Sequence, residues 1–294
     1  MNFTLELTKP QIDALLDYYT NEQNTSNNPY VIAVVKKPRV TVTVYTTHKV
    51  LFQGEDSEFE MLFWSDAFKL DVKIDQKENS DYFLTSIGSD ESGVGDFFGP
   101  LTVASAYVKE SDQAFLSSLK INDSKKLTDQ HILTIAPKII EKIPYSLLVL
   151  SNKQYNALTK KGYNAHKLKA HMHSQTHKHL LQKIQKKPIV IIDQFCNKAL
   201  YLKYTNDFDK PVIPDIFKTK AESYYASVAV ASIIARYSYI THLDKLSKAV
   251  GMVLPKGASS KVDDAAKSLV KSKGKAILDK VAKTHFKTLD KISE

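Results

Sequence analysis

One short segment, residues 89–100 (SDESGVGDFFGP), constrains the fold of this chain more than any other. It follows a predicted strand at residues 83–88 and precedes an apolar strand predicted at 101–108. Asp90 and Glu91 therefore stand at or near the C-terminal end of a strand. Two adjacent carboxylates are costly there unless a cation neutralises them, and Mg²⁺ prefers carboxylate and water oxygens. The segment therefore predicts a divalent-metal site at the edge of a sheet.

Two glycines follow these acids directly. Gly93 and Gly95 allow backbone amides to approach a ligand, because no Cβ stands in the way. We expect a side chain at either position to displace the backbone or to demand an unfavourable φ. A solvated turn would also explain the Asp-Glu pair. A nucleotide-binding loop is disfavoured, because neither G-x-G-x-x-G nor G-K-[ST] is met and the next segment is predicted as strand.

Two further acids occupy promising positions. Asp193 ends the short apolar strand predicted at 189–192, where α/β proteins place functional groups, although an Asp there could also cap a helix. Glu222 falls in the first turn of an apolar helix predicted over 221–246. It could simply favour the helix dipole, but its nearness to Lys218 and Lys220 also fits an edge that faces phosphates.

The positive charge is unevenly distributed. The formal net charge is +9, yet the first 80 residues hold 8 Lys and Arg against 12 Asp and Glu, and the remainder holds 33 against 20. Residues 142–192 contain ten Lys, five His and no acid. Such a stretch indicates a surface that follows a phosphate backbone, with a merely solubilising surface as the alternative. Zinc binding by the His-rich residues 166–179 is not expected, because no Cys or acid completes a tetrahedral set.

The chain divides into two predicted domains. The pattern of residues 1–78 predicts a small α+β domain of strands and two helices. The polar segment 75–81 (DQKENSD) is the best candidate for a linker. Residues 82–294 mix strands and helices in an order that predicts a mixed sheet covered by helices. The single Cys196 excludes a disulfide scaffold and is expected to be a buried thiol. No signal peptide is evident, and the longest weakly polar stretch, 224–235, is too short for a membrane helix.

Taken together, six segments resemble the type 2 ribonucleases H and, within them, ribonuclease HIII. They are DESGVGDFFGP (90–100), NDSKKLTD (122–129), VIIDQF (190–195), TKAESYYASVAVASIIARY (219–237), LPKGAS (254–259) and AKTHFK (282–287), in the order of the family. Ribonuclease HII typically has Arg or Lys between the two glycines, whereas this chain has Val94. A domain of about 80 residues also precedes the motifs, as in the HIII type.

The resemblance implies both a fold and an activity. The fold would be α/β, a ribonuclease H-like mixed sheet flanked by helices, preceded by a small domain similar to the TATA-binding protein that holds substrate. The activity would be hydrolysis of the RNA strand of RNA/DNA hybrids, leaving 5′-phosphate and 3′-hydroxyl ends. Asp90, Glu91, Asp193 and Glu222 would be the catalytic residues and the ligands of two divalent ions, Mg²⁺ or Mn²⁺.

The resemblance also implies substrate contacts. Backbone groups of Gly93, Val94 and Gly95 would read the 2′-hydroxyl, and basic or hydroxyl groups would hold phosphates. These are Ser124, Lys125, Lys126, Lys218 and Lys220. We expect a cytoplasmic protein that needs neither a membrane nor an obligate protein partner. Cleavage at single ribonucleotides in DNA, as by ribonuclease HII, and nucleic-acid binding without catalysis remain the alternatives.

The N-terminal domain is net acidic, so a broad positive field cannot explain substrate binding by it. Its few basic groups include Lys36, Lys37 and Arg39, which cluster around Pro38 at a strand turn. We therefore expect contact through a limited surface, the sheet face together with this turn.

Overall fold

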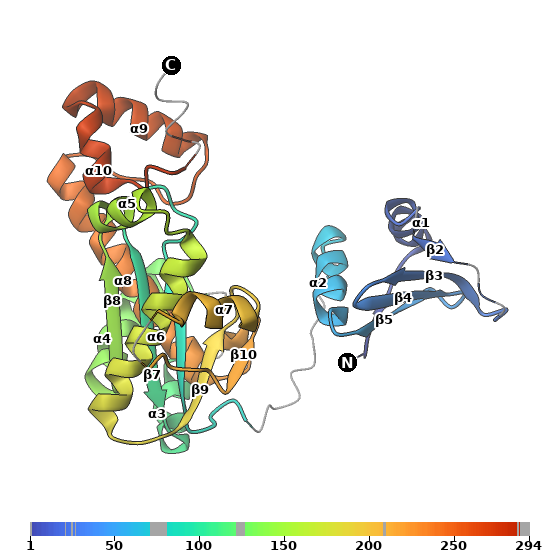
Figure 1. Ribbon diagram of the computed structural model, residues 1–294. Coiled ribbons are helices and arrows are strands. Elements are labelled where there is room, and N and C mark those ends of the chain that lie inside the picture. Colours follow the sequence, from blue (N-terminus) through green and yellow to red (C-terminus); the bar gives the residue numbers. More distant parts are fainter. Residues whose placement is uncertain are drawn as a thin grey trace. The chain divides into compact units, whose positions relative to one another are not determined.

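The structure is a computed structural model that describes residues 2–20, 22–24, 26, 28–70, 81–121, 127–207, 210–286 and 288. The chain forms two compact units, Met1–Lys77 and Glu78–Glu294, each with a core of its own (Figure 1). Within the described ranges, none of the helices is both long and apolar enough to cross a membrane.

The N-terminal unit is an antiparallel sheet with two helices. The strand order is β1-β5-β4-β3-β2. The elements are β1 (Asn2–Glu6), α1 (Lys9–Tyr18), β2 (Gln23–Asn24), β3 (Val31–Lys37), β4 (Val40–Tyr45), β5 (Lys49–Gly54) and α2 (Ser57–Ala67). Because side chains alternate along β4, Val42 and Val44 both point into the core, where they pack with Phe52 and Trp64. The two-residue strand β2 was not predicted, because a pair of residues gives no periodicity to detect.

The opposite face of this sheet carries a row of side chains outside the core. The strand register places Val34, Thr43, Leu51 and Thr4 next to one another across four strands. Because side chains alternate along a strand, this row points away from the core valines. The N-terminal unit therefore presents one sheet face that its own helices do not bury.

The larger unit is built on a mixed five-stranded sheet, which confirms the predicted fold class. Its strands are β6 (Ser86–Ser92), β7 (Leu101–Val108), β8 (Tyr145–Leu150), β9 (Ile189–Asp193) and β10 (Ile216–Lys218), in the order β10-β9-β6-β7-β8. Strands β6, β9 and β10 run parallel, whereas β7 and β8 are antiparallel to their neighbours. The helices are α3 (Gln113–Ser118), α4 (Asp129–Lys142), α5 (Asn152–Lys160), α6 (Ala165–Ile184), α7 (Lys198–Thr205), α8 (Ala226–Val250), α9 (Ser260–Lys273) and α10 (Leu278–Val281), with short 3₁₀ turns η1 (Glu110–Asp112), η3 (Ala221–Ser223) and η4 (Lys275–Ile277).

Helices α8 and α6 cover opposite faces of this sheet. On one face, Ser86 of β6 hydrogen-bonds Ser227 of α8 at 2.8 Å between hydroxyl oxygens. Gly88 lies on the same face, and a Cβ there would stand 2.3 Å from the backbone nitrogen of Val228, so α8 can approach only a glycine. On the other face, Ile87 packs with Leu180 of α6. Even-numbered residues of β6 therefore face α8 and odd-numbered residues face α6.

Two boundaries differ from the sequence predictions at functionally important places. Strand β6 begins at Ser86 rather than residue 83 and continues to Ser92, because β7 pairs with it as far as Ser92 opposite Thr102. The acids therefore lie inside the strand's last three residues. Glu222 is not in the first turn of the long helix, since residues 221–223 form the separate turn η3 and α8 begins only at Ala226.

Candidate active site

Strand pairing brings the predicted acids to one edge of the sheet. Asp90 and Glu91 stand near the end of β6, and the parallel strand β9 pairs Ile192 with Ser89, so Asp193 follows at the level of Asp90. An oxygen of Asp193 accepts a hydrogen bond from the backbone N–H of Ala221 at 2.9 Å. This bond joins the end of β9 to η3 and sets Glu222 beside the same edge.

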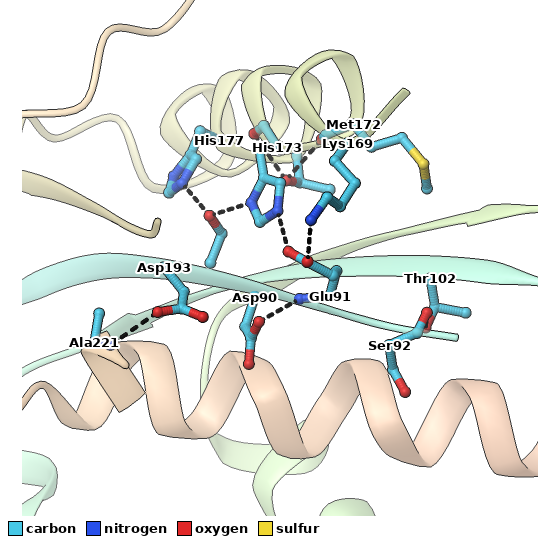
Figure 2. Close-up of polar contacts among 12 residues, drawn as sticks. Asp90, Glu91, Ser92, Thr102, Lys169, Met172, His173, His177, Asp193 and Ala221 are labelled. Carbon is cyan, nitrogen blue, oxygen red and sulfur yellow. Dashed lines mark hydrogen bonds and ion pairs between the residues drawn. The ribbon is translucent and has the colours of Figure 1, made fainter. Parts of the chain in front are cut away.

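Asp90 and Glu91 point to opposite faces of the sheet because they are neighbours in a strand. Figure 2 shows Asp90 directed toward α8, with Asp193 on the same side, and Glu91 directed toward α6. Asp90 accepts the backbone N–H of Glu91 at 2.7 Å. The acids therefore divide into one group beside α8 and a single acid beside α6.

The group beside α8 concentrates negative charge in a buried place. Burial, followed by the charges of Glu91 and Asp193, raises the pKa of Asp90 well above its usual value, although a hydrogen bond from Ser232 opposes this. Burial, followed by the charges of Glu222 and Glu91, raises the pKa of Asp193 to about 7. A cation held near carboxylates that disfavour one another's charge would favour their ionised forms.

Glu91 is in the reverse situation. Lys169 of α6 donates to one carboxylate oxygen at 2.8 Å, and the Nε2 atom of His173 lies 2.9 Å from the other. Burial alone would raise the pKa of Glu91, but His173 and then Lys169 hold it below its usual value. Glu91 is therefore a carboxylate whose charge is already balanced by partners on the neighbouring helix.

The donor chemistry of this edge suits hard divalent cations. Among the described residues, no three His, Cys, Asp or Glu side chains form a ready metal cluster. Mg²⁺ does not require one, because it usually takes one or two carboxylates from a protein and completes its shell with waters and substrate phosphates. Asp90 and Asp193 offer carboxylate oxygens on one side of the strand, and Glu222 is near enough to raise the pKa of Asp193, so the residues present fit such ions.

The glycine turn after β6 contains two different glycines. Gly93 has φ +90°, and a Cβ on it would stand 2.2 Å from the carbonyl oxygen of Pro100, so the fold itself requires glycine there. A Cβ on Gly95 would meet nothing within 4 Å, and its φ lies outside the glycine-favouring region. The expectation that a side chain at Gly95 strains the backbone is therefore wrong. Val94, between them, packs against the cluster of Leu101 and Tyr155.

Buried bonds to the C-terminal segment hold this turn. Asp96 accepts the backbone N–H of Gly257 at 2.6 Å. The fully buried ammonium of Lys283 donates to the carbonyl oxygens of Asp96 at 2.8 Å and Gly99 at 2.6 Å. Gly257 of the segment LPKGAS and Lys283 of the segment AKTHFK thus support the turn that follows the predicted catalytic acids.

The remaining predicted substrate contacts fall in different places. Ser124, Lys125 and Lys126 lie outside the described residues. Lys218 stands opposite Asp193 in the register of the parallel strands β10 and β9. Its ammonium lies 3.2 Å from the ring centre of Tyr224. Lys220 is half-buried in a left-handed conformation with φ +55° immediately before η3. The two lysines therefore flank the strand end that carries Asp193.

A cavity of about 290 Å³ opens beside the acids on the α8 face. Ser92, Ser232 and Arg236 line it, together with Asp129 at the start of α4. Asp129 accepts a hydrogen bond from Nε of Arg236 at 3.1 Å and also pairs with Lys256. Of the four predicted acids, Glu91 lines this cavity, so the cavity places a fixed guanidinium near that residue.

Sequence reasoning missed four side chains of the site. They are Lys169, His173, Ser232 and Arg236. Lys169 and His173 are four residues apart, as residues on one helix face must be, and this spacing inside a helix without acids was the available signal. Ser232 and Arg236 share the same spacing, but nothing in the sequence says that Asp90 lies opposite them.

Comparisons with known proteins agree on the family. A family model described as ribonuclease HII matches residues 87–289, and a domain described only as of unknown function matches residues 2–77. The ribonuclease HIII of Bacillus subtilis (strain 168) is 39% identical over 98% of this chain and 95% of its own length. That of Oceanobacillus iheyensis is 42% identical over 97% of this chain and 96% of its own. The crystal structure of Bst-RNase HIII in complex with Mn²⁺ superposes with a TM-score of 0.71 at 37% identity, covering 100% of this chain and 98% of that one.

Proposed function

The chain belongs to the type 2 ribonuclease H family as a ribonuclease HIII, and we propose that Asp90, Glu91, Asp193 and Glu222 carry out its reaction. It is an endoribonuclease that cleaves the RNA strand of RNA/DNA hybrids with Mg²⁺ or Mn²⁺. The observation that supports this assignment is the meeting of β6, β9 and η3 at one sheet edge, where the pKa values of Asp90 and Asp193 are raised.

Each acid has a part that its surroundings suggest. Asp90 and Asp193 lie side by side on the α8 face and would share metal ions, with Glu222 as a further ligand beside Asp193. Glu91 would bind from the α6 face with a carboxylate already fixed. When bound, two divalent ions would lower the pKa of a water and would stabilise negative charge on the departing 3′-oxygen. Because the water oxygen would stay on phosphorus while the 3′-oxygen leaves, the products would carry 5′-phosphate and 3′-hydroxyl ends.

The turn after β6 would select RNA. Backbone groups of Gly93, Val94 and Gly95 stand next to the metal-binding acids, and the open space at Gly95 allows a ribose to come close. Lys218 and Lys220 flank Asp193 and would contact phosphates, as would Ser124, Lys125 and Lys126. Selection of the 2′-hydroxyl by backbone groups requires no base contact, which suits an enzyme that acts on hybrids of any sequence.

Residues 1–78 would bind substrate for the catalytic domain of residues 82–294. The open sheet face supports this, but the predicted basic turn needs revision. The Lys37 ammonium lies 3.0 Å from the carboxylate of Glu60, and Arg39 pairs with Glu55 and Asp56. Among the described residues, Lys36 makes no ion pair, and its register places it beside Thr41 and Gln53 on the outer face. The proposed contact is therefore the sheet face with Lys36.

A panel of substrates tests the reaction. Labelled RNA/DNA hybrid, RNA duplex, DNA duplex and a DNA duplex with one ribonucleotide are each incubated with Mg²⁺ or Mn²⁺. We expect cleavage of the hybrid, with 5′-phosphate products. Preferential cleavage at the single ribonucleotide would instead support activity of the ribonuclease HII kind. Asp193→Asn should abolish cleavage and retain hybrid binding; cleavage at the wild-type rate would contradict the metal assignment.

The N-terminal domain is tested in the full chain and by truncation. Removal of residues 1–80 should raise KM for the hybrid and leave the single-turnover rate of bound substrate mostly intact. Lys36→Ala should raise KM in the same direction. Arg39→Ala is the matched control, because its charge is already paired with Glu55 and Asp56. An unchanged KM in both the truncated chain and Lys36→Ala would refute a binding role.

We also propose that the enzyme works in the cytoplasm and without an obligate protein partner. All four acids come from this one chain, which supports catalysis by a single copy. Activity that stays proportional to enzyme concentration over a wide dilution range would support this, and loss of specific activity on dilution would contradict it.

A further inference from the structure

A chain of buried polar contacts runs from Glu91 into the protein on the α6 face. The Nε2 atom of His173 contacts Glu91 at 2.9 Å, and its Nδ1 atom contacts the hydroxyl of Ser89 at 2.7 Å. The Nε2 atom of His177 contacts the same hydroxyl at 2.7 Å. Both imidazoles and Ser89 are fully buried. Figure 2 shows His177 and His173 on α6, with Glu91 on the strand below them.

The chemistry of these groups fixes the direction of the hydrogen bonds. Among the described residues, no group bonds to the buried Nδ1 of His177. A buried N–H without an acceptor costs more than a bare ring nitrogen, so the proton belongs on Nε2. His177 then donates to Ser89, the Ser89 hydroxyl donates to Nδ1 of His173, and Nε2 of His173 donates to Glu91. One orientation of every hydrogen thus satisfies the whole series.

The same helix supplies the second oxygen of Glu91 with a donor. Lys169, His173 and His177 recur at intervals of four residues and therefore share one face of α6. The ring of Phe195, two residues after Asp193, contacts this face of α6. The Lys169 ammonium is 4.3 Å from its centre, and the His173 ring stacks on it at 5.1 Å between centroids. Neither donor to Glu91 can turn away without breaking these contacts.

We propose that Lys169 and His173 are positioning residues that fix the Glu91 carboxylate for metal binding, with Ser89 and His177 behind them holding the His173 ring. This inference rests on the proposed function, in which Glu91 is a metal ligand. A carboxylate at a strand end can adopt several rotamers, and all but one of them are lost when it binds an ion. Hydrogen-bond donors on both oxygens hold the carboxylate in one rotamer before the ion binds, and they leave the remaining lone pairs for the ion.

Mn²⁺ binding to the full chain, measured by calorimetry without substrate, tests whether His173 positions Glu91. His173→Leu should weaken Mn²⁺ binding about 10-fold to 100-fold, as loss of a partner behind a metal ligand usually does. His173→Gln places an amide N–H near the former Nε2 and should restore most of the loss. An equal loss in the Leu and Gln variants would overturn the positioning role.

Two serines test the second step. Ser105 pairs with Ser89 across β7 and β6, is equally buried on the same face, and has no hydrogen-bond partner for its hydroxyl among the described residues. Ser89→Ala should weaken Mn²⁺ binding about threefold or more, which corresponds to one ordinary hydrogen bond. Ser105→Ala should bind Mn²⁺ like the wild type. Equal behaviour of the two variants would overturn the role of Ser89.

The same measurements separate this inference from the function on which it rests. If Glu91→Gln retains wild-type Mn²⁺ binding, Glu91 is not a ligand, and the assignment and the positioning role both fail. If Glu91→Gln loses binding but His173→Leu and Lys169→Met do not, the positioning role alone fails. Loss in all three, with circular dichroism and the melting midpoint retained in His173→Gln, supports it.

Discussion

On the α6 face of β6, Glu91 has a donor on each carboxylate oxygen, whereas on the α8 face Asp90 and Asp193 stand beside further acids. The pKa of Glu91 is lowered by His173 and Lys169 against the effect of burial. Burial and neighbouring carboxylates raise the pKa values of Asp90 and Asp193. The protein's own groups therefore balance the charge on one face only, and under the proposed function a bound cation would balance it on the other.

The turn after β6 shows a similar contrast between a residue that contacts within the protein require and one that they do not. Gly93 is required by the fold, because a Cβ would collide with Pro100. Gly95 meets no neighbour, so its small size serves something outside the protein or nothing. Where internal contacts fully explain a residue, its substitution should cost stability. Where they do not, substitution should cost function alone.

The largest expected effect is on cleavage by carboxylate variants of the two faces. Asp90→Asn and Glu91→Gln should each lower the single-turnover rate at least about 100-fold, because a catalytic ion contributes several kcal/mol of transition-state stabilisation. The rates are measured with saturating enzyme and Mg²⁺, so that weaker substrate binding does not contribute. Near wild-type cleavage by Glu91→Gln alone would mean that the α6 face is purely structural.

Without metal, the same two substitutions should change the free energy of unfolding in opposite directions. Glu91→Gln leaves the ammonium of Lys169, whose side chain is only 8% exposed, without its counter-charge, and should lower the free energy of unfolding by about 3 kcal/mol. Asp90→Asn removes a carboxylate that burial and two neighbouring acids disfavour, and should raise it. Urea denaturation at pH 7 with EDTA measures both. Destabilisation by both substitutions would remove the contrast between the faces.

The sequence predicts one half of this contrast better than the other. Strand ends, adjacent acids and glycines are local features, so Asp90, Glu91 and Asp193 could be proposed from their neighbours in the chain. The partners of Glu91 come from a helix 78 and 82 positions away, at Lys169 and His173. Local periodicity does not say which face of α6 meets which strand, so the pairing could not be foreseen.

The boundary errors have the same cause. The strand β6 reaches Ser92 because β7 pairs with it that far, which is a tertiary effect. Residues 221–223 separate from α8 because Ala221 donates to Asp193, an interaction between distant segments. The short elements α7 and β10 escaped prediction because eight and three residues give little periodicity.

The two glycines give the next test. Gly93→Ala should lower stability by about 1–3 kcal/mol, since alanine is strained at its φ of +90°. Gly95→Ala should leave the melting midpoint unchanged and lower cleavage about tenfold, the worth of one hydrogen bond at the ribose.

A double-mutant cycle combines Gly95→Ala with a substrate that has deoxyribose beside the scissile phosphate. The two changes together should lower the rate by less than the product of their separate effects, because both remove one shared contact. Single-turnover rates of the four combinations measure the coupling. Full additivity with an intact fold would mean that this turn does not read the 2′-hydroxyl.

The smallest expected effect concerns the buried support of that turn and its dependence on pH. Burial lowers the pKa of Lys283 to about 7, although the Asp96 carboxylate opposes this. Between this value and the ordinary lysine pKa, the unfolded chain binds the proton and the folded chain releases it, so stability rises with pH. The wild type should therefore gain about 1 kcal/mol of unfolding free energy between pH 7 and 8 relative to Lys283→Met. Lys261→Met, an exposed control on α9, should show no such difference from the wild type. A constant offset between wild type and Lys283→Met across this range would mean that Lys283 stays charged in the folded protein, and that the two carbonyl oxygens and Asp96 stabilise its ammonium as fully as water does.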